Sequence, residues 1–318
     1  MNPQHVAQIL QQLTAAISPA VLGSERNLRF AFIAYLVKGH ILMEGVPGTG
    51  KTFLARALAR CLGLDLGRVQ CTPDLMPGDV VGANIFDFRN QSFALIKGPV
   101  FTEFLLVDEI NRTPPKTQSA LLEAMQERSV TIDGETHRLP DRFMVVATQN
   151  PVEHEGTYPL PEAQLDRFLF KLSVGYPAEE QEVQAVLAHC GSSGTPDLDS
   201  LGLAPVVDPA SLDALRSAPA HVHVDPAIAA YAVRLARATR THPSLSVGLS
   251  PRAATMLTAA ARANAACEGR NYVIPDDLKA LFVAGARHRV ITTPAAEMED
   301  VQIDDVLAAL AEEVPAPR

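Results

Sequence analysis

Cysteine is scarce in this chain of 318 residues, and so are the other features of secreted or membrane proteins. The four cysteines, Cys61, Cys71, Cys190 and Cys267, form no C-x-x-C pair, which is typical of reduced thiols rather than of disulfides or a zinc site. No apolar run approaches the length of a membrane span, and no basic start followed by an apolar core opens the chain. We therefore expect a cytoplasmic protein without membrane insertion.

Positive charge is also in deficit. The chain has 27 Lys and Arg against 36 Asp and Glu, a net charge of -9. This balance argues against a general basic surface that coats duplex DNA, although a locally basic channel stays open. There is no internal repeat or low-complexity tract, and 47% hydrophobic with 20% charged residues is typical of a globular chain. The length is sufficient for two domains.

Glycine is sparse as well, so one glycine-rich stretch stands out. It fits the phosphate-loop pattern G-x-x-x-x-G-K-[ST] and comprises Gly45, Val46, Pro47, Gly48, Thr49, Gly50, Lys51 and Thr52. Residues 40–44 resemble a short buried strand, and the residues from Phe53 to Ala59 favour a helix. Because this order of strand, glycine loop and helix is the one that phosphate binding needs, a glycine turn with an incidental lysine is the weaker interpretation.

In a phosphate loop, backbone N–H groups cradle the phosphates at the start of the helix. Lys51 would then neutralise the β and γ phosphates, and the Thr52 hydroxyl would bind Mg²⁺. The predicted nucleotide contacts run from Gly45 to Phe53. The sequence therefore predicts ATP and Mg²⁺ as cofactors.

Two adjacent carboxylates follow a second apolar segment, residues 104–107. This segment predicts a strand that is covered on both faces, so Asp108 and Glu109 would emerge at the carboxyl edge of the sheet. Mg²⁺ prefers oxygen ligands, a role for Asp108, which leaves Glu109 to polarise the attacking water. Without the phosphate loop, the pair could equally be a helix cap.

Apolar strands alternate with helices over the first 175 residues. We expect helices at residues 6–17 and 24–37, and strands at 69–71, 104–107, 143–147 and 168–170. This alternation predicts an α/β fold, with a mostly parallel sheet sandwiched by helices. Two excursions, about residues 80–98 and 128–140, read as hairpins around Arg89-Asn90 and Asp133-Gly134. They either carry a function or only cover the sheet.

The remainder, residues 176–318, is alanine-rich and predicts an all-helical second domain. Helices are expected at residues 179–189, 211–218, 226–239, 251–267, 275–286 and 301–310, with a break at 191–196. We thus expect a nucleotide-binding α/β domain over residues 1–175 and a helical domain over residues 176–318.

Together these motifs resemble the AAA+ ATPases. The phosphate loop and L-L-V-D-E-I-N-R at residues 105–112 are similar to that superfamily, and A-T-Q-N-P at 147–151 with G-T-Y-P-L-P-E-A-Q-L-D-R-F at 156–168 resembles its MoxR branch. The second half also matches, through V-H-V-D-P at 222–226, S-P-R-A at 250–253 and E-G-R-N-Y-V at 268–273. The resemblance covers nearly the whole chain and implies a phosphate-loop NTPase core with a C-terminal helical lid.

The resemblance also implies roles for single residues. Asn150 corresponds to the sensor 1 residue that holds the lytic water or γ-phosphate, Arg167 to the arginine finger of a neighbouring subunit, and Arg252 to sensor 2. Taken alone, Asn150 would be a turn former and the two arginines solvated side chains. The hairpins correspond to the helix-2 and pre-sensor-1 inserts, which in such rings point toward the pore or the client. Ser24 replaces the usual glutamine of the adenine-contacting segment, residues 22–25, which leaves the base contact there open.

The implied function is Mg-dependent ATP hydrolysis by a homo-oligomeric ring, expected to be a hexamer. Such a ring remodels a protein client, often one with a von Willebrand factor A domain, to mature a complex or insert a metal cofactor. A chelatase-like motor subunit and a nucleic-acid motor are the alternatives. Binding of nucleic acid is the less favoured one, because acidic residues accompany Arg89 and Arg138 at the hairpin tips. The third rival, a scaffold with little turnover, is disfavoured by the presence of Glu109 and Arg167.

Overall fold

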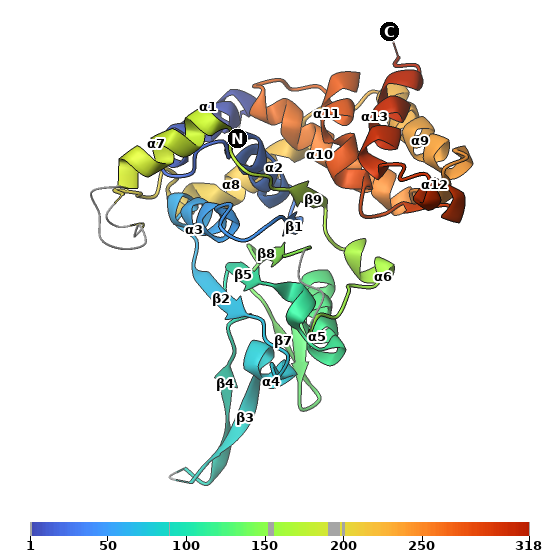
Figure 1. The fold of residues 1–318 in the computed structure, drawn as a ribbon. Coiled ribbons are helices and arrows are strands. Elements are labelled where there is room, and N and C mark those ends of the chain that lie inside the picture. Colours follow the sequence, from blue (N-terminus) through green and yellow to red (C-terminus); the bar gives the residue numbers. More distant parts are fainter. Residues whose placement is uncertain (1, 89, 152–155, 190–197, 199–200, 318) are drawn as a thin grey trace.

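A parallel sheet of five strands forms the centre of the N-terminal half (Figure 1). The computed structural model describes residues 2–88, 90–151, 156–189, 198 and 201–317. Across the sheet the strand order is β2-β5-β8-β1-β9, and neighbouring strands are all parallel. The strands are β1 (Ile41–Glu44), β2 (Leu66–Gln70), β5 (Phe104–Asp108), β8 (Met144–Gln149) and β9 (Phe170–Ser173). Their carboxyl ends therefore meet at one edge, where α/β proteins bind ligands.

Helices cover both faces of this sheet, which confirms the predicted three-layer α/β architecture. One face packs against α1 (Pro3–Ile17), α2 (Glu25–Leu36) and α3 (Lys51–Leu62), the other against α5 (Pro115–Glu127). Side chains alternate between the two faces because the strand period is two residues. Ile41, Met43, Leu106 and Val146 belong to the first face, and Leu42, Leu105, Val107 and Val145 to the second.

Both predicted hairpins are present. The first, β3 (Gly82–Asp87) and β4 (Ser92–Lys97), follows α4 (Pro77–Val81) and projects away from the body of the molecule (Figure 1). The second consists of β6 (Ser129–Ile132) and β7 (Glu135–Arg138). Its turn residues, Asp133 and Gly134, both have positive φ (48° and 86°), as a tight two-residue hairpin turn requires. Asn84 donates a hydrogen bond to Asp133 Oδ2 at 2.9 Å, which joins the two hairpins.

The C-terminal half is helical. Its helices are α6 (Glu162–Leu165), α7 (Glu179–His189), α8 (Leu212–Ser217), α9 (Pro226–Thr241), α10 (Pro251–Cys267), α11 (Pro275–Ala286), α12 (Pro294–Met298) and α13 (Ile303–Glu313). Short 3₁₀ turns, η1 (Ile110–Arg112), η2 (Pro209–Ser211) and η3 (Ala218–His221), and a small β pair, β10 (Leu245–Val247) and β11 (Ile291–Thr292), complete the described elements. The predicted spans 251–267 and 275–286 match the structure. The predicted break at 191–196 lies outside the described residues.

The lid helices share an apolar core with the helices that cover the sheet. One continuous cluster of buried side chains runs from α1 through the sheet face to α13. Polar contacts reinforce it, since Arg29 Nη2 donates to Asn264 Oδ1 at 2.8 Å and pairs with Glu268 at 2.5 Å. The domain boundary at residue 175 stays a prediction. No helix in the described part of the chain is long and apolar enough to cross a membrane.

Three cysteines, Cys61, Cys71 and Cys267, are buried free thiols whose pKa values burial raises. Cys190 lies outside the described residues.

Candidate active site

The phosphate loop connects β1 to α3, as predicted. Gly48 and Gly50 have φ values of 82° and 80°, in the left-handed region that other residues rarely adopt. Gly45 is required for a different reason, because a Cβ atom there would lie 2.2 Å from the Val174 carbonyl oxygen. The loop ends at the N-terminus of the 12-residue helix α3, where unpaired N–H groups and the helix dipole favour an anion.

Lys51 extends back across this loop. Its ammonium group donates to the carbonyl oxygens of Gly45 at 2.8 Å and Val46 at 2.7 Å. Desolvation lowers the Lys51 pKa, and the nearby carboxylates of Asp108 and Glu109 oppose that shift. A cation is thus fixed at the mouth of the loop, within reach of a bound phosphate chain.

Asp108 is buried at the end of β5 and is the centre of a hydrogen-bonded group. Thr52 Oγ1 donates to Asp108 Oδ1 at 2.7 Å, Thr148 Oγ1 donates to the same oxygen at 3.2 Å, and Arg68 Nε donates to Oδ2 at 2.9 Å. A hydroxyl and a carboxylate oxygen side by side match the hard oxygen ligands that Mg²⁺ takes beside phosphate and water. The described residues contain no cluster of three His, Cys, Asp or Glu that would suit another metal.

Glu109, the next residue, has a left-handed backbone conformation (φ 60°, ψ 51°), which is uncommon for a residue with a side chain. Its N–H donates to Thr148 Oγ1 at 3.0 Å. Its carboxylate forms an ion pair with Arg112 Nε at 3.3 Å and accepts from Gln70 Nε2 at 3.5 Å. Strained residues of this kind concentrate at functional sites. The bend turns the Glu109 carboxylate into the same cavity as Thr52 and Asp108.

Two cavities adjoin at the loop, and Thr49, Gly50 and Lys51 line both. The cavity at the carboxyl edge of the sheet has a volume of about 390 Å³; the predicted residues Thr52, Phe53, Asp108, Glu109 and Asn150 are part of its lining. The other, of about 240 Å³, lies between α2, α7 and α11; Leu22, Ser24, Tyr176, Gln181 and Arg287 are part of its lining. The structure thus brings together most of the predicted site residues.

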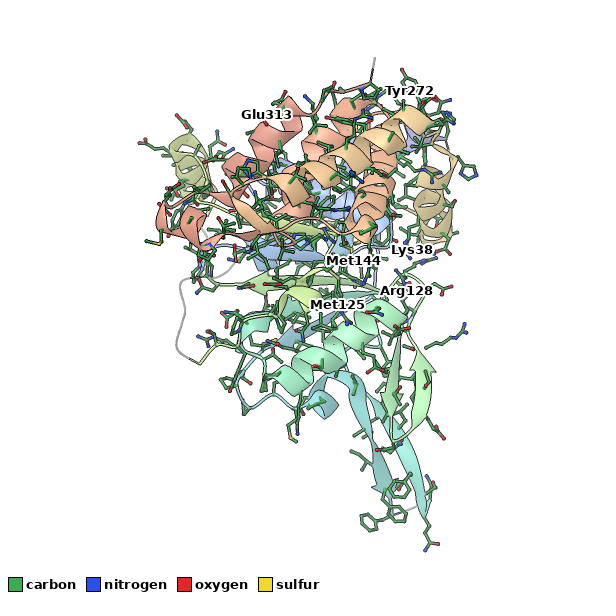
Figure 2. The ribbon with its side chains drawn as sticks, turned by 90° about the vertical axis from the view of Figure 1, so that its right-hand side faces the viewer. Lys38, Met125, Arg128, Met144, Tyr272 and Glu313 are labelled. Carbon is green, nitrogen blue, oxygen red and sulfur yellow. The ribbon has the colours of Figure 1, made fainter. Side chains whose placement is uncertain are left out.

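Arg167 and Arg252 are the exceptions, because neither lines these two cavities. Both instead line a cavity of about 220 Å³ with Lys38 and Arg128, and no carboxylate contributes to its lining. Figure 2 shows the side of the molecule on which Lys38, Arg128 and Met125 lie. Arg167 Nη1 donates to the Leu122 carbonyl at 2.6 Å, and Arg252 Nη1 lies 3.8 Å from Asp166 Oδ2.

Several residues of the site were missed from the sequence. Arg68 and Gln70 alternate with buried Val69 in β2, so the two-residue period of the strand could have indicated that they share a face. Thr148 lies within the quoted A-T-Q-N-P motif. Arg287, in contrast, comes directly after α11, and no local pattern connects it to a loop more than 200 residues earlier.

Comparisons with known proteins agree with this geometry. A family model described as "ATPase family associated with various cellular activities (AAA)" matches residues 40–170, and one described as "AAA lid domain" matches residues 237–310. The uncharacterized protein YeaC of Bacillus subtilis is 43% identical over 97% of this chain and 95% of its own length. Chaperone MoxR1 of Mycobacterium tuberculosis is 39% identical over 97% of this chain and 82% of its own length.

Protein MoxR of Methylorubrum extorquens is 36% identical over 95% of this chain and 93% of its own length. A crystal structure from Cytophaga hutchinsonii, of a protein provisionally assigned as an ATPase, superimposes with a TM-score of 0.90. It is 35% identical and the match covers 99% of this chain and 97% of that one. The chain therefore belongs to the MoxR family of AAA+ ATPases.

Proposed function

We propose that the chain hydrolyses ATP at a site shared between neighbouring subunits of a ring, expected to be a hexamer, and uses the hydrolysis to remodel a protein client. The ATPase activity follows from the family. The sharing of the site rests on one observation. Arg167 and Arg252 lie together in a cavity without carboxylates, and that cavity is separate from the two at the phosphate loop of the same chain.

The phosphate loop, Lys51 and the start of α3 would bind the triphosphate. Backbone N–H groups from Gly48 onward would surround the β-phosphate, and Lys51 would exchange its two carbonyl partners for phosphate oxygens. The Thr52 hydroxyl would hold Mg²⁺ directly, and Asp108 would hold it through a water molecule. When bound, the ion offsets the charge of the phosphates. The adenosine would occupy the adjoining cavity between α2, α7 and α11. There the Ser24 hydroxyl donates to the Val21 carbonyl, so the base contact depends on other lining groups.

The hydrolytic step uses the carboxylate that follows the magnesium residue. Glu109 would accept a hydrogen bond from the attacking water and polarise it, while the neighbouring Asn150 orients the water or the γ-phosphate. Water attacks the γ-phosphorus, the bond from that phosphorus to the β,γ-bridging oxygen breaks, and ADP and phosphate result. The Asp108 carboxylate stays bonded to Thr52, Thr148 and Arg68, so it is held in place during the reaction.

A second subunit would supply the missing cations. Arg167 and Arg252 do not line the cavities at their own loop, and charge on the equatorial oxygens of the transferring phosphoryl group calls for guanidinium donors. In a head-to-tail ring, the cavity with Lys38, Arg128, Arg167 and Arg252 would meet the loop of the next subunit. Arg252 would then report nucleotide state across the interface, as sensor 2 acting on the neighbouring site.

The client would be a protein, with a von Willebrand factor A domain partner as the candidate implied by the MoxR resemblance. The name of one relative, Chaperone MoxR1, supports a protein client. So does the tip of the β3-β4 hairpin, where the Phe86 ring lies 5.2 Å from Phe88 and 5.3 Å from Phe93. Phe88 and Phe93 are 85% and 72% exposed. Exposed apolar patches of this kind commonly contact proteins.

A nucleic-acid motor is less well supported by the same hairpin. Its phenylalanine rings could stack on bases, but Ile85 and Ile96, which belong to the same exposed apolar surface, cannot. Asp87 adds negative charge to the tip, which disfavours a phosphate backbone. A chelatase-like motor would use the same ATPase cycle and differ in its partner. ATPase activity that depends on a porphyrin-binding subunit would support this alternative.

The deciding experiment measures ATP hydrolysis per subunit against protein concentration for wild type, Arg167→Ala, Lys51→Ala and an equal mixture of the two variants. A shared site predicts that specific activity rises with concentration and that the mixture is more active than either variant. Random mixing leaves about a quarter of the interfaces with both an intact loop and an intact finger. Arg138→Ala, a change of an exposed arginine on β7, is the matched control. Activity that is independent of concentration and unaffected by Arg167→Ala would refute the shared site.

A further inference from the structure

Helix α7 carries an exposed apolar face. Val183, Val186 and Leu187 are 53%, 66% and 68% exposed, and their i, i+3, i+4 spacing places them on one side of the helix. At about 100° per residue, Glu180 and Glu182 flank this side on opposite edges. The other side of α7 faces the molecule, where Gln181 lines the cavity at the phosphate loop.

The acidic residues of α7 have a simpler explanation, since glutamates in the first turn stabilise a helix through its dipole. That explanation does not extend to the three apolar residues, which a solvated helix face would not need. Peptide-binding grooves recognise amphipathic helices through anchors at this same i, i+3, i+4 spacing.

A groove of matching character lies on the lid, between α9 and α10, with a volume of about 610 Å³. Alanines from both helices, together with Val233, which is about half exposed, make its apolar part; those alanines are Ala229, Ala232, Ala236, Ala254 and Ala259. Its charged lining residues are Arg237, Arg240 and Arg262, and no carboxylate contributes to the lining. The groove is therefore complementary to α7 in both apolar character and charge.

The two surfaces cannot meet within one chain, because α7 and α9 lie at opposite ends of the molecule (Figure 1). They are, however, next to the two halves of the shared site. Gln181 of α7 lines the cavity at the phosphate loop, while Pro251, which precedes Arg252 in the first turn of α10, lines the groove. If Arg252 approaches a neighbouring loop, the groove approaches the neighbouring α7.

We propose that the apolar face of α7 docks into the α9-α10 groove of the adjacent copy of the chain and so forms a principal contact of the ring. This inference rests on the proposed shared site, because the direction of the contact follows from Arg252. Head-to-tail contacts between different surfaces are those that close into rings. The contact would cover the apolar residues of α7 and seat its glutamates among the three groove arginines.

The test uses the whole chain and reverses the charges on each side. Glu180→Arg with Glu182→Arg changes α7, Arg237→Glu with Arg240→Glu changes the groove, and a combined chain carries all four substitutions. Glu313→Arg, near the end of α13, and Arg234→Glu, on α9 outside the groove, are the matched controls. Sedimentation velocity with a slowly hydrolysed ATP analogue and Mg²⁺ measures the concentration at which half of the protein is assembled.

We expect each side's substitution to raise this concentration by at least about tenfold, and the combined chain to return to within about threefold of wild type. Recovery in the combined chain excludes misfolding of either variant. A Val183→Asp variant should also fail to assemble while keeping the wild-type Tm. Normal assembly of the single-side variants would reject the α7 contact and leave the shared site standing. Failure of the wild type to assemble at any concentration would instead refute the ring, and the contact with it.

Discussion

Arg289 Nε donates to Asp166 Oδ1 at 2.7 Å, immediately beside the candidate finger residue Arg167. The Arg289 side chain is only 2% exposed and also donates to the carbonyl oxygens of Phe168 at 2.6 Å and Leu169 at 3.1 Å. A lid residue thus holds the segment that carries the finger. Arg287, two residues earlier, lines the cavity at the phosphate loop. Three consecutive residues of the lid therefore connect a subunit's own nucleotide cavity to the finger that it would present to its neighbour.

Replacing Arg289 should impair turnover more than binding. In Arg289→Gln the finger segment loses its fixed position, and we expect kcat to fall by about 10²-fold, the usual cost of misplacing a catalytic group. The nucleotide Kd should stay within about threefold, since Arg289 does not line either cavity at the phosphate loop. Steady-state hydrolysis and fluorescent nucleotide titration measure the two quantities.

Two further variants interpret that result. Arg289→Lys should rescue little, because an ammonium cannot reproduce the planar fork of a guanidinium on several acceptors. Lys279→Gln, which removes an exposed ion pair with Glu312, is the control for a general effect on the lid. Equal losses of kcat and of nucleotide affinity in Arg289→Gln would mean that the residue only stabilises the fold.

Mixed assemblies should separate the arginines that act within a subunit from those that act across the interface. Arg252→Ala mixed with Lys51→Ala should regain hydrolysis, because an intact loop can then meet an intact Arg252 on the neighbour. Arg287→Ala mixed with Lys51→Ala should gain nothing beyond the sum of the two, since Arg287 lines the cavity of its own subunit. The measurement is ATP hydrolysis by the two mixtures at equal total protein. Recovery in the Arg287→Ala mixture but not in the Arg252→Ala mixture would mean that Arg287 acts across the interface and Arg252 within its own subunit.

The sequence predicted the regular elements well where local signals were strong. Proline at the first turn marks the starts of α10 and α11, and Asp133-Gly134 marks the β6-β7 turn, so these elements lie where expected. Helix α5 was not predicted, although Leu121, Leu122 and Met125 have helical spacing. Strand β9 starts at Phe170, two residues later than expected, since Phe168 still belongs to a turn bonded to Leu165.

The residues of the candidate site also divide into those that local sequence patterns predicted and those that they did not. The loop and the Asp108-Glu109 pair are contiguous motifs whose spacing carries the chemistry, so sequence alone located them. The approach of Arg287 to the loop, and of Arg252 to Arg167, depends on how the lid packs against the sheet domain. The sequence pattern within a helix does not encode that packing, because an apolar helix face has the same residue spacing whichever element covers it.

Substitution of the phosphate-loop lysine and of the catalytic carboxylate should block different steps of the ATPase cycle. Lys51→Ala removes the cation at the mouth of the loop and should abolish measurable nucleotide binding. Glu109→Gln keeps the shape of the side chain but removes the carboxylate that polarises water. The variant should therefore bind ATP at wild-type affinity while turnover falls by about 10²- to 10⁴-fold. Equilibrium binding and phosphate release measure the two. Tight ATP binding by Lys51→Ala, or wild-type turnover by Glu109→Gln, would remove that residue from the mechanism.

The hairpin tip should matter for polypeptide binding. Phe88→Ser with Phe93→Ser removes two exposed rings, each worth about 1.5–3 kcal/mol when buried by a partner, so affinity for an unfolded polypeptide should fall at least about tenfold. Anisotropy of a labelled, reduced and alkylated polypeptide measures it. Met298→Ser, an equally exposed apolar site on α12, should leave the affinity unchanged. Equal affinity for the hairpin variant would exclude the rings from client contact.

The buried imidazole of His40 should make stability depend on pH. His40 Nε2 donates to the Met125 carbonyl at 3.0 Å, and Nδ1 accepts from the Val145 N–H at 2.9 Å, an arrangement that requires the neutral ring. Burial lowers the pKa of His40 from 6.5 to about 4. The unfolded chain therefore takes up a proton before the folded chain does, and stability from this group is complete above pH 6.5. It declines between pH 6.5 and 4, with a total loss of about 3 kcal/mol.

In His40→Asn, the amide oxygen can still accept from Val145, but no group titrates in this range. We expect the variant to be less stable at pH 7, because the Met125 carbonyl loses its donor, and to lose less stability than wild type on acidification. Urea unfolding midpoints between pH 7 and 4.5 measure both effects. His288, whose pKa burial also lowers, is present in both chains, so the difference between their slopes isolates His40. Parallel slopes would mean that His40 does not titrate differently in the folded and unfolded chains.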